Sequence, residues 1–336
     1  MYVVVLGGGE NDERAVSAAT ACAAETALRE SGHVVTTLDP ARWPESARFV
    51  STVPESEPDA GETRRLTDRL ESNLRSGLFW AEIEKADVVF LALVGGAGEN
   101  GTLKAMLERR GLRSTGATSA AMRLAWNKKR ALEHIEAAGV GVARSVLVSD
   151  AYPSPEDVAD ALVAELGGEV VVKPVEGGSS LGVTACSNLD ELCAALKLAE
   201  GAVLVEERLT GPEFTVGILG DEALPPVLIE PPNGWFGYAE KYQPGVSREL
   251  CPAPVDRSLD ARLRREAVRA ARSLGFDASS YARVDFMMDG DGELRCLEVN
   301  ALPGLTESSL LPLAAMVHGW TFPQLCERII ALSARQ

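Results

Sequence analysis

Three oxygen-bearing side chains lie near the C-terminus on two segments that alternate like strands. Asp285 lies in the apolar run ARVDFMMD, and Glu298 and Asn300 follow in CLEVN, two residues apart. Side chains two apart on a strand project from the same face, so Glu298 and Asn300 point to one side of the second strand. Carboxylate and amide oxygens suit Mg²⁺, which often bridges protein carboxylates and nucleotide phosphates. The pattern predicts a magnesium site, and a β-hairpin with solvated acids is the alternative.

A lysine at the end of an apolar run is followed by a glycine-rich loop. Lys173 ends the run VVVKP, and EGGSSLG comes next. Glycines let backbone N–H groups approach an anion closely, so a lysine beside such a loop indicates a phosphate site. Because the lysine precedes the glycines, the phosphate-binding loop GxxxxGK[ST] is excluded. The segment favours a nucleotide, and a hairpin turn is the alternative.

Two further acids follow the next apolar run. Glu206 lies in VLVEERL and Glu213 in GPEFTV, where carboxylates could receive an adenine amino group and ribose hydroxyls, or could equally be surface acids. The glycines of VVVLGGGEND suggest a dinucleotide fingerprint, but Asp12 occupies the last glycine position of GxGxxG. These glycines are therefore weak evidence for NAD.

The elements expected in the first part of the chain place these groups on a sheet. Residues 2–6 form an apolar strand that ends in glycines, and a helix is expected from about residue 13 to 29. Further strands are expected at 34–38 and 88–93, and the polar stretch 42–64 between them predicts an exposed loop or insertion. Alternating strands and helices predict a parallel sheet with functional loops at the strand ends.

A smaller α/β unit is expected to follow. It contains a helix from Asn127, a strand near Val146, a helix that begins at Ser154, and the run EVVVKP. Antiparallel strands are then expected in VLVEERL, EFTVGIL and LPPVLIE. A helix at 259–274, the acidic hairpin and two final helices complete the chain.

Composition narrows the class of protein. The 336 residues exceed one ordinary core, so two or three domains are expected. A net charge of −16 opposes binding to nucleic acid.

No apolar run approaches a membrane span, and MYVVVLGGG lacks the features of a signal peptide, so no membrane partner and a cytoplasmic location are expected. The six cysteines form no CxxC pair, which predicts reduced thiols and no structural zinc.

Taken in order, the motifs of this chain resemble the ATP-grasp superfamily, and more closely the D-alanine:D-alanine ligase family. The resemblance runs through nearly the whole chain and rests on seven ordered segments: GGGENDERAVS (7–17), GENGTLKAMLE (98–108), KPVEGGSSLG (173–182), VEERLTGPEFTV (205–216), EKY (240–242), RVDFMMD (283–289) and LEVNALPGLTESSLLP (297–312). It implies an α/β fold, α+β in its C-terminal part, with the three-domain ATP-grasp architecture. The implied domains are an N-terminal parallel-sheet domain at 1–120, a small central subdomain at 121–205 and a C-terminal domain at 206–336.

The resemblance also implies an ATP site with two magnesium ions. Lys128, Lys173 and Ser180 would contact ATP phosphates, and Lys241 would reach the γ-phosphate. Glu206, Leu209 and Glu213 would surround adenine and ribose. The metal ligands would be Asp285, Glu298 and Asn300.

By the same resemblance, the carboxylate of one amino acid attacks ATP to give an acyl phosphate, and the amine of a second amino acid then forms the peptide bond. Glu13 would anchor the first ammonium group, with Ser179 and Tyr242 completing a hydrogen-bonded set. Arg283 and the N–H of Gly304 would stabilise the oxyanion, since loss of one such donor typically costs about 2.7 to 4 kcal/mol. The second carboxylate would be bound by Ser309 and the N–H of Leu310, at the start of a helix.

Two positions depart from the family pattern. Val94 stands where the segment HGxxGEDG usually has its histidine, and Asn100 replaces its aspartate. The leading hypothesis is a D-alanine:D-alanine ligase for peptidoglycan precursor synthesis. Because the missing histidine lies near the substrates, a relative that makes another dipeptide, amide or depsipeptide is the alternative. The third hypothesis is an ATP-binding protein without turnover. The resemblance also suggests a homodimer with small amino-acid substrates.

Overall fold

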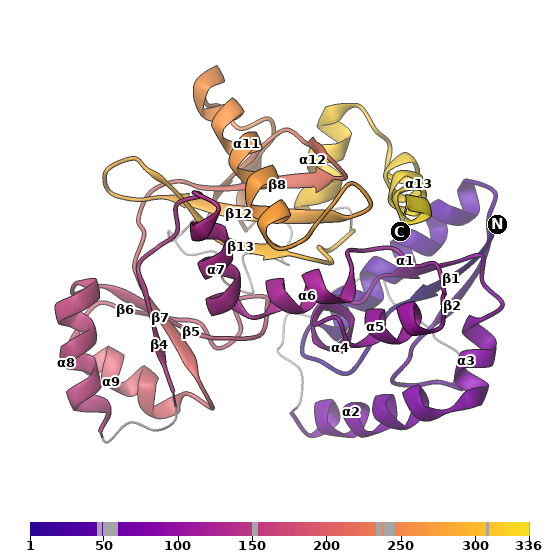
Figure 1. The fold of residues 1–336 in the computed structure, drawn as a ribbon, viewed down its shortest axis with the longest axis horizontal. Helices are drawn as coiled ribbons and strands as arrows, with labels where there is room; N and C mark the ends of the chain where they lie inside the picture. Colours follow the sequence, from indigo (N-terminus) through magenta and orange to yellow (C-terminus); the bar gives the residue numbers. More distant parts are fainter. Residues whose placement is uncertain are drawn as a thin grey trace.

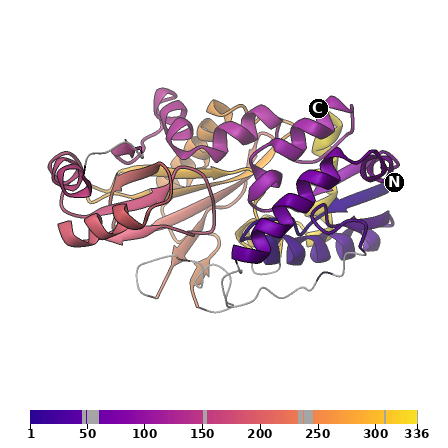
Figure 2. The same ribbon diagram turned by 90° about the horizontal axis from the view of Figure 1, so that it is seen from below.

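The computed structural model describes residues 1–45, 49, 60–149, 154–232, 237, 246–306 and 309–335. Three sheets form the framework, and Figures 1 and 2 show the N-terminal sheet and the small central sheet at opposite ends of the molecule. The larger C-terminal sheet lies between them. Most of the predicted polar stretch 42–64 lies outside the described residues, and α2 begins at Ala60.

The N-terminal sheet has three parallel strands in the order β2-β1-β3. Residues 3–6 of the central strand are fully buried, which explains why this strand reads as a continuous apolar run. The prediction of a parallel sheet is confirmed, although β3 ends two residues before the expected position. The elements are β1 (Tyr2–Leu6), α1 (Arg14–Glu30), β2 (Val34–Leu38), α2 (Ala60–Arg75), α3 (Gly77–Ile83) and β3 (Val88–Leu91).

Four short helices connect this sheet to the rest of the chain. Thr118 caps one of them by accepting from the N–H of Ala121, and Asn127 caps the next by accepting from Arg130 N at 3.1 Å. They are α4 (Gly96–Glu99), α5 (Thr102–Arg109), α6 (Ser119–Trp126) and α7 (Lys128–Ala137). Both α6 and α7 contact β13 of the C-terminal sheet, although the sequence assigns them to the small central unit.

The small central sheet is antiparallel throughout, in the order β4-β7-β5-β6. Ser154 begins its first helix as predicted, and its hydroxyl accepts from Asp157 N at 3.1 Å. The expected domain boundary at 205/206 falls inside β7, so we propose that the unit ends after Glu207. Its elements are β4 (Ser145–Val148), α8 (Pro155–Leu166), β5 (Val170–Pro174), β6 (Thr184–Cys186), α9 (Leu189–Leu198) and β7 (Val203–Glu207).

The C-terminal sheet is also antiparallel, in the order β11-β10-β8-β12-β13 with β9 paired to β8. The acidic segments form the adjacent strands β12 and β13, with Asp285 directly opposite Glu298. The strands are β8 (Glu213–Leu219), β9 (Glu222–Ala223), β10 (Val227–Glu230), β11 (Arg248–Leu250), β12 (Tyr281–Met288) and β13 (Leu294–Asn300). The helices are α11 (Arg257–Ser273), α12 (Leu310–His318), α13 (Phe322–Leu332) and the 3₁₀ turn η1 (Ser333–Arg335).

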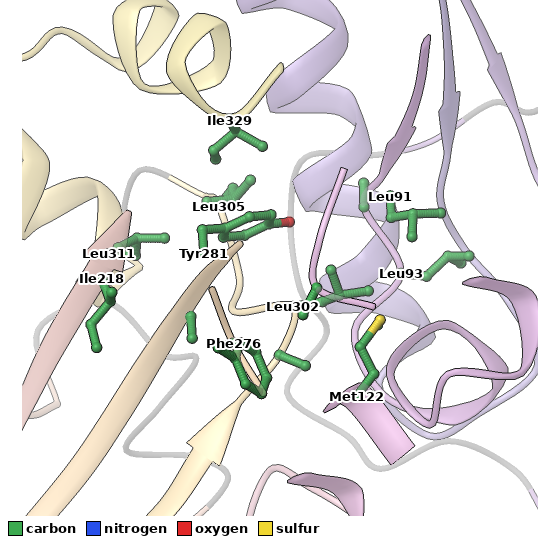
Figure 3. Close-up of a cluster of buried hydrophobic side chains, with 14 of the residues drawn as sticks. Leu91, Leu93, Met122, Ile218, Phe276, Tyr281, Leu302, Leu305, Leu311 and Ile329 are labelled. Atoms are coloured by element: carbon green, nitrogen blue, oxygen red, sulfur yellow. The ribbon is translucent and has the colours of Figure 1, made fainter. Parts of the chain in front are cut away.

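One continuous apolar core joins the N-terminal and C-terminal sheets, whereas the small central sheet has a separate core. Figure 3 shows Leu91 and Leu93 from the N-terminal side near Leu302, with Tyr281 and Leu305 close by. The two larger units are therefore packed as one body, and the cleft between them and the small sheet is where a ligand can enter. All six cysteines are free thiols, as predicted.

Candidate active site

A cleft of about 360 Å³ lies between the small central sheet and the C-terminal sheet. Its walls carry residues from segments that are far apart in sequence, and they include each described residue assigned to ATP. The predicted residues that line it are Lys128, Lys173, Ser179, Ser180, Glu206, Leu209, Glu213, Arg283, Asp285, Glu298 and Leu310. Lys241 and Tyr242, also predicted, lie outside the described residues.

The floor of the cleft contains a buried ion pair. Lys173 Nζ lies 2.7 Å from Glu206 Oε2, and the two side chains are 9% and 6% exposed. They meet because β5 and β7 are neighbours, with Val171 directly opposite Glu206. The other carboxylate oxygen, Oε1, is buried and has no hydrogen-bond partner within the described residues. Because such an atom is costly to leave unpaired, it is a natural acceptor for a donor group on a ligand.

Lys128 links the glycine-rich loop to the acidic hairpin. It begins α7, its backbone N–H donates to Val175 O at 2.9 Å, and its Nζ donates to the carbonyl of Gly177. The same Nζ lies 3.9 Å from Glu298 Oε2. Burial lowers the pKa of Lys128, while the charge of Glu298 opposes that shift. A partly desolvated cation at this point suits an anionic phosphate.

The three predicted metal ligands converge. Asn300 Nδ2 donates to Asp285 Oδ2 at 2.9 Å and approaches Glu298 Oε1 at 3.5 Å. Thr215 Oγ1 donates to Asp285 Oδ1 at 2.6 Å. Arg283 holds both oxygens of Asp285, with Nε–Oδ1 at 2.9 Å and an Nη–Oδ2 distance of 2.8 Å. Only two of the three ligands are acidic, and no group of three or more His, Cys, Asp or Glu side chains that could hold a metal occurs in the described part of the chain.

A smaller pocket of about 60 Å³ adjoins the cleft and is lined by the residues assigned to the amino acids. The hydroxyl of Ser179 donates to the carboxylate of Glu13, so the glycine-rich loop of the small unit touches the N-terminal domain. Ser179 and Ser180 have φ values of 51° and 58°, a left-handed conformation that is uncommon outside glycine. The pocket includes Glu13, Val94, Glu99, Ser179, Glu249, Arg283, Glu298, Asn300, Gly304, Ser309 and Leu310.

The far wall of this pocket is the start of α12. Ser309 is its N-cap residue, and Leu310 is its first residue. Ser309 Oγ accepts from Thr306 N at 3.0 Å and lies 2.8 Å from Thr306 Oγ1. A side chain at Gly304 would place its Cβ 3.0 Å from Ser309 Oγ, so glycine keeps this wall open. A helix N-terminus attracts a carboxylate through its unpaired N–H groups and dipole.

Val94 is fixed by its backbone, and its side chain is 7% exposed. Its carbonyl oxygen accepts from Asn11 Nδ2 at 3.1 Å and from Ser17 Oγ at 3.1 Å. The residue lines the smaller pocket together with Glu13. An apolar isopropyl group therefore lies where the family pattern would put an imidazole.

Sequence reasoning assigned no role to three residues that support the site: Thr215, Glu249 and Glu99. Glu99 is buried, and its carboxylate accepts from the N–H groups of Gly95 at 3.0 Å, Ala301 at 3.0 Å and Leu302 at 3.4 Å. Burial and the nearby charge of Glu13 raise the pKa of Glu99 to about 7. Glu99 thus links the loop after β3 to the loop after β13, two segments about 200 residues apart in the sequence. The only sequence feature that pointed to Glu99 was its place in the segment GENG.

Comparisons with known proteins agree with this geometry. The family model described as the D-ala D-ala ligase N-terminus matches residues 2–117, and the model of the D-ala D-ala ligase C-terminus matches residues 135–331. The D-alanine–D-alanine ligase of Nitratidesulfovibrio vulgaris is 36% identical, with 99% of this chain and 98% of that protein covered. The ligase of the same name from Dechloromonas aromatica is 39% identical over 74% of this chain and 81% of that protein.

Solved structures show the same architecture. The chain resembles the VanG D-Ala:D-Ser ligase of Enterococcus faecalis with a TM-score of 0.75 and 26% identity, covering 99% of each chain. It resembles a D-alanine–D-alanine ligase of Bacillus anthracis with a TM-score of 0.77 and 26% identity, covering 100% of this chain and 98% of the other.

Together, the sheet order, the cleft and its charged lining define an ATP-dependent ligase with the ATP-grasp fold. The chain belongs to the D-alanine–D-alanine ligase family. The predictions of family, fold class and reaction class are confirmed. Within the described residues, no helix combines the length and apolar character needed to cross a membrane.

Proposed function

We propose that the protein joins two D-alanine molecules at the expense of ATP and so supplies a dipeptide precursor of peptidoglycan. The observation that carries this proposal is the junction of the two pockets, where Arg283 and Glu298 line both the large cleft and the small pocket. A phosphoryl group bound in the cleft would thus face a carboxylate bound in the pocket. The homodimer implied by the resemblance and the cytoplasmic location expected from the sequence remain predictions.

ATP fits the large cleft through residues of this chain. The unpaired Oε1 of Glu206 would accept a hydrogen bond from the adenine amino group, beside Leu209. Glu213 lines the same cleft and would receive ribose hydroxyls. Lys128, Lys173 and Ser180 would hold the phosphates, because two lysines within one enclosed site offset several negative charges.

The acidic hairpin fits magnesium by its donor set of two carboxylates and one amide, held together by hydrogen bonds. Asp285, Glu298 and Asn300 would hold the two expected ions. Bound magnesium would neutralise phosphate charge and align the transferring group. Arg283, oriented by its two bonds to Asp285, would in addition help to stabilise the oxyanion beside the N–H of Gly304.

The two amino acids would occupy the smaller pocket. Glu13, held by Ser179, would bind the first ammonium group and direct its carboxylate toward the γ-phosphate. Attack of that carboxylate forms a C–O–P link and releases ADP. The second amino acid, held by its carboxylate at Ser309 and Leu310, would attack the acyl carbon through its neutral amine, and phosphate would leave. The enclosed pocket limits hydrolysis of the acyl phosphate.

A different second substrate is the alternative, because Val94 replaces the family's histidine beside Glu13. The structural relative from Enterococcus faecalis is described as a D-Ala:D-Ser ligase, which shows that this architecture accommodates more than one product. An ATP-binding protein without turnover is less well supported, since Lys173, Arg283 and Glu298 are all present and line one cleft.

The test is ADP release by the purified protein with ATP and magnesium, measured against a panel of D- and L-amino acids and hydroxy acids. D-alanine alone should give ADP and the dipeptide in equal amounts. If D-alanine alone gives no ADP while a pair of other substrates does, the substrate assignment is wrong and the alternative stands. Failure with every substrate would support a binding protein.

A further inference from the structure

The smaller pocket contains four glutamates, and three of them are engaged. Glu13 accepts from Ser179, Glu99 accepts from three backbone N–H groups, and Glu298 lies beside Asn300 and Lys128. Glu249 also lines the pocket, but its carboxylate forms no hydrogen bond or ion pair within the part of the chain that the structure describes. A half-buried carboxylate that lacks a hydrogen bond or ion pair is costly, so the position of Glu249 beside the reaction site suits a ligand group that pairs with it.

The register of the C-terminal sheet determines where Glu249 points. It lies on the edge strand β11, directly opposite Ile229 of β10, which is directly opposite Glu213 of β8. Directly opposed residues of antiparallel strands project from the same face. Because Ile229 and Glu213 both line the large cleft, Glu249 faces the cleft as well. Its neighbour Arg248 projects the other way and pairs with Glu230 at 3.3 Å.

Negative side chains outnumber positive ones around Glu249 in the smaller pocket. Burial raises the pKa of Glu249, and the positive charge of Arg283 on β12 opposes that shift. The only cation that lines the smaller pocket within the described residues is that of Arg283, which is already held by both oxygens of Asp285. The other charged groups that line this pocket are acidic: Glu13, Glu99 and Glu298. A further positive group brought by a substrate would therefore be attracted to Glu249.

The proposed reaction brings two ammonium groups into this pocket. Glu13 accounts for the first. The second amino acid, bound by its carboxylate at the start of α12, must place its nitrogen near the acyl carbon, close to Arg283 and Gly304. Those residues share the pocket with Glu249. We propose that Glu249 binds the ammonium group of the second amino acid and orients its nitrogen, so that the neutral amine, formed when this group releases a proton to solvent, is directed at the acyl carbon. This inference rests on the proposed ligase function and adds to it the residue that selects an amine as the acceptor.

The experiment compares Glu249→Gln with wild type, using two acceptors. With D-alanine alone, the acceptor KM should rise by about 10- to 100-fold, because a hydrogen bond between charged groups is lost. Hydroxylamine is uncharged at mildly alkaline pH and traps the acyl phosphate as a hydroxamate, so it needs no carboxylate. Hydroxamate formation, and the KM of ATP and of the first D-alanine measured in that assay, should stay within about twofold of wild type.

Two further variants sharpen the result. Glu230→Gln makes the same change one strand away on the opposite face, at an exposed residue, and should leave both assays unchanged. Glu249→Asp keeps the charge and should restore part of the acceptor affinity. An unchanged acceptor KM in Glu249→Gln would overturn the inference, and so would equal losses of dipeptide and hydroxamate. If wild type makes neither product from D-alanine, the proposed function itself fails.

Discussion

Replacement of Lys173 by Met should destabilise the protein strongly, because it leaves Glu206 buried and unpaired. The two charges lie 2.7 Å apart on side chains that are 9% and 6% exposed. At an effective dielectric constant of about 20, their attraction is about 6 kcal/mol, and it offsets a desolvation penalty of several kcal/mol for each ion. Removing one partner of such a pair typically costs about 3 to 5 kcal/mol. That loss is a large part of the stability of an ordinary domain.

The assay is urea unfolding without ATP, for Lys173→Met, Glu206→Gln and the double variant. The double variant should recover most of the loss, since neither charge then stays buried alone. ATP binding, measured by calorimetry, should be weak in Lys173→Met and in the double variant, because the phosphates lose a cation. Two results would refute the idea that this buried pair is coupled. One is a single variant with the same free energy of unfolding as wild type. The other is a double variant whose loss of unfolding free energy equals the sum of the losses in the two single variants.

Three other changes test the site. Glu298→Gln should abolish turnover and remove the magnesium dependence of ATP binding, because one of the two predicted carboxylate ligands is lost; retained magnesium-dependent binding would contradict the ligand assignment. Val94→His should change the preference among second substrates more than ATP affinity, measured by ADP release over the substrate panel, and an unchanged profile would show that this position does not select substrates. Folding raises the pKa of Glu99 from 4.5 to about 7. Between these two pH values the folded protein binds more protons than the unfolded protein. The free energy of unfolding therefore falls, by up to about 3 kcal/mol in total, as the pH rises from 4.5 to 7. Glu99→Gln should flatten this slope in urea titrations, and an unchanged slope would assign the pH dependence to other groups.

The sequence was sufficient for features that depend on local pattern. Strand 2–6, the helix that begins at Ser154 and the pairing of Asp285 with Glu298 all follow from periodicity, capping and short turns. The residues assigned to ATP were chosen through ordered motifs, and each one in the described part lines the large cleft, while their roles stay predictions.

Features that depend on sheet order could not be inferred in this way. Nothing local shows that Glu99 meets Ala301, because these residues approach only when two separate sheets share one core. In the sequence, nothing distinguishes Glu249 from any other acidic residue on a short strand. Only its pairing with Ile229 shows that its side chain faces the cleft. The ion pair of Arg283 with Asp285 was also missed, since the motif gave each residue a separate role.

The separate core of the small central sheet bears on how the site is completed. Its apolar residues pack among themselves, whereas the N-terminal and C-terminal sheets share one core. The glycine-rich loop of the small unit nevertheless supplies Ser179 to Glu13 and the carbonyl of Gly177 to Lys128. The group that would bind the first ammonium is thus oriented by a loop that would also cover ATP. We therefore expect the first amino acid to bind more tightly when ATP is present, because the nucleotide holds that loop in place before the amino acid arrives.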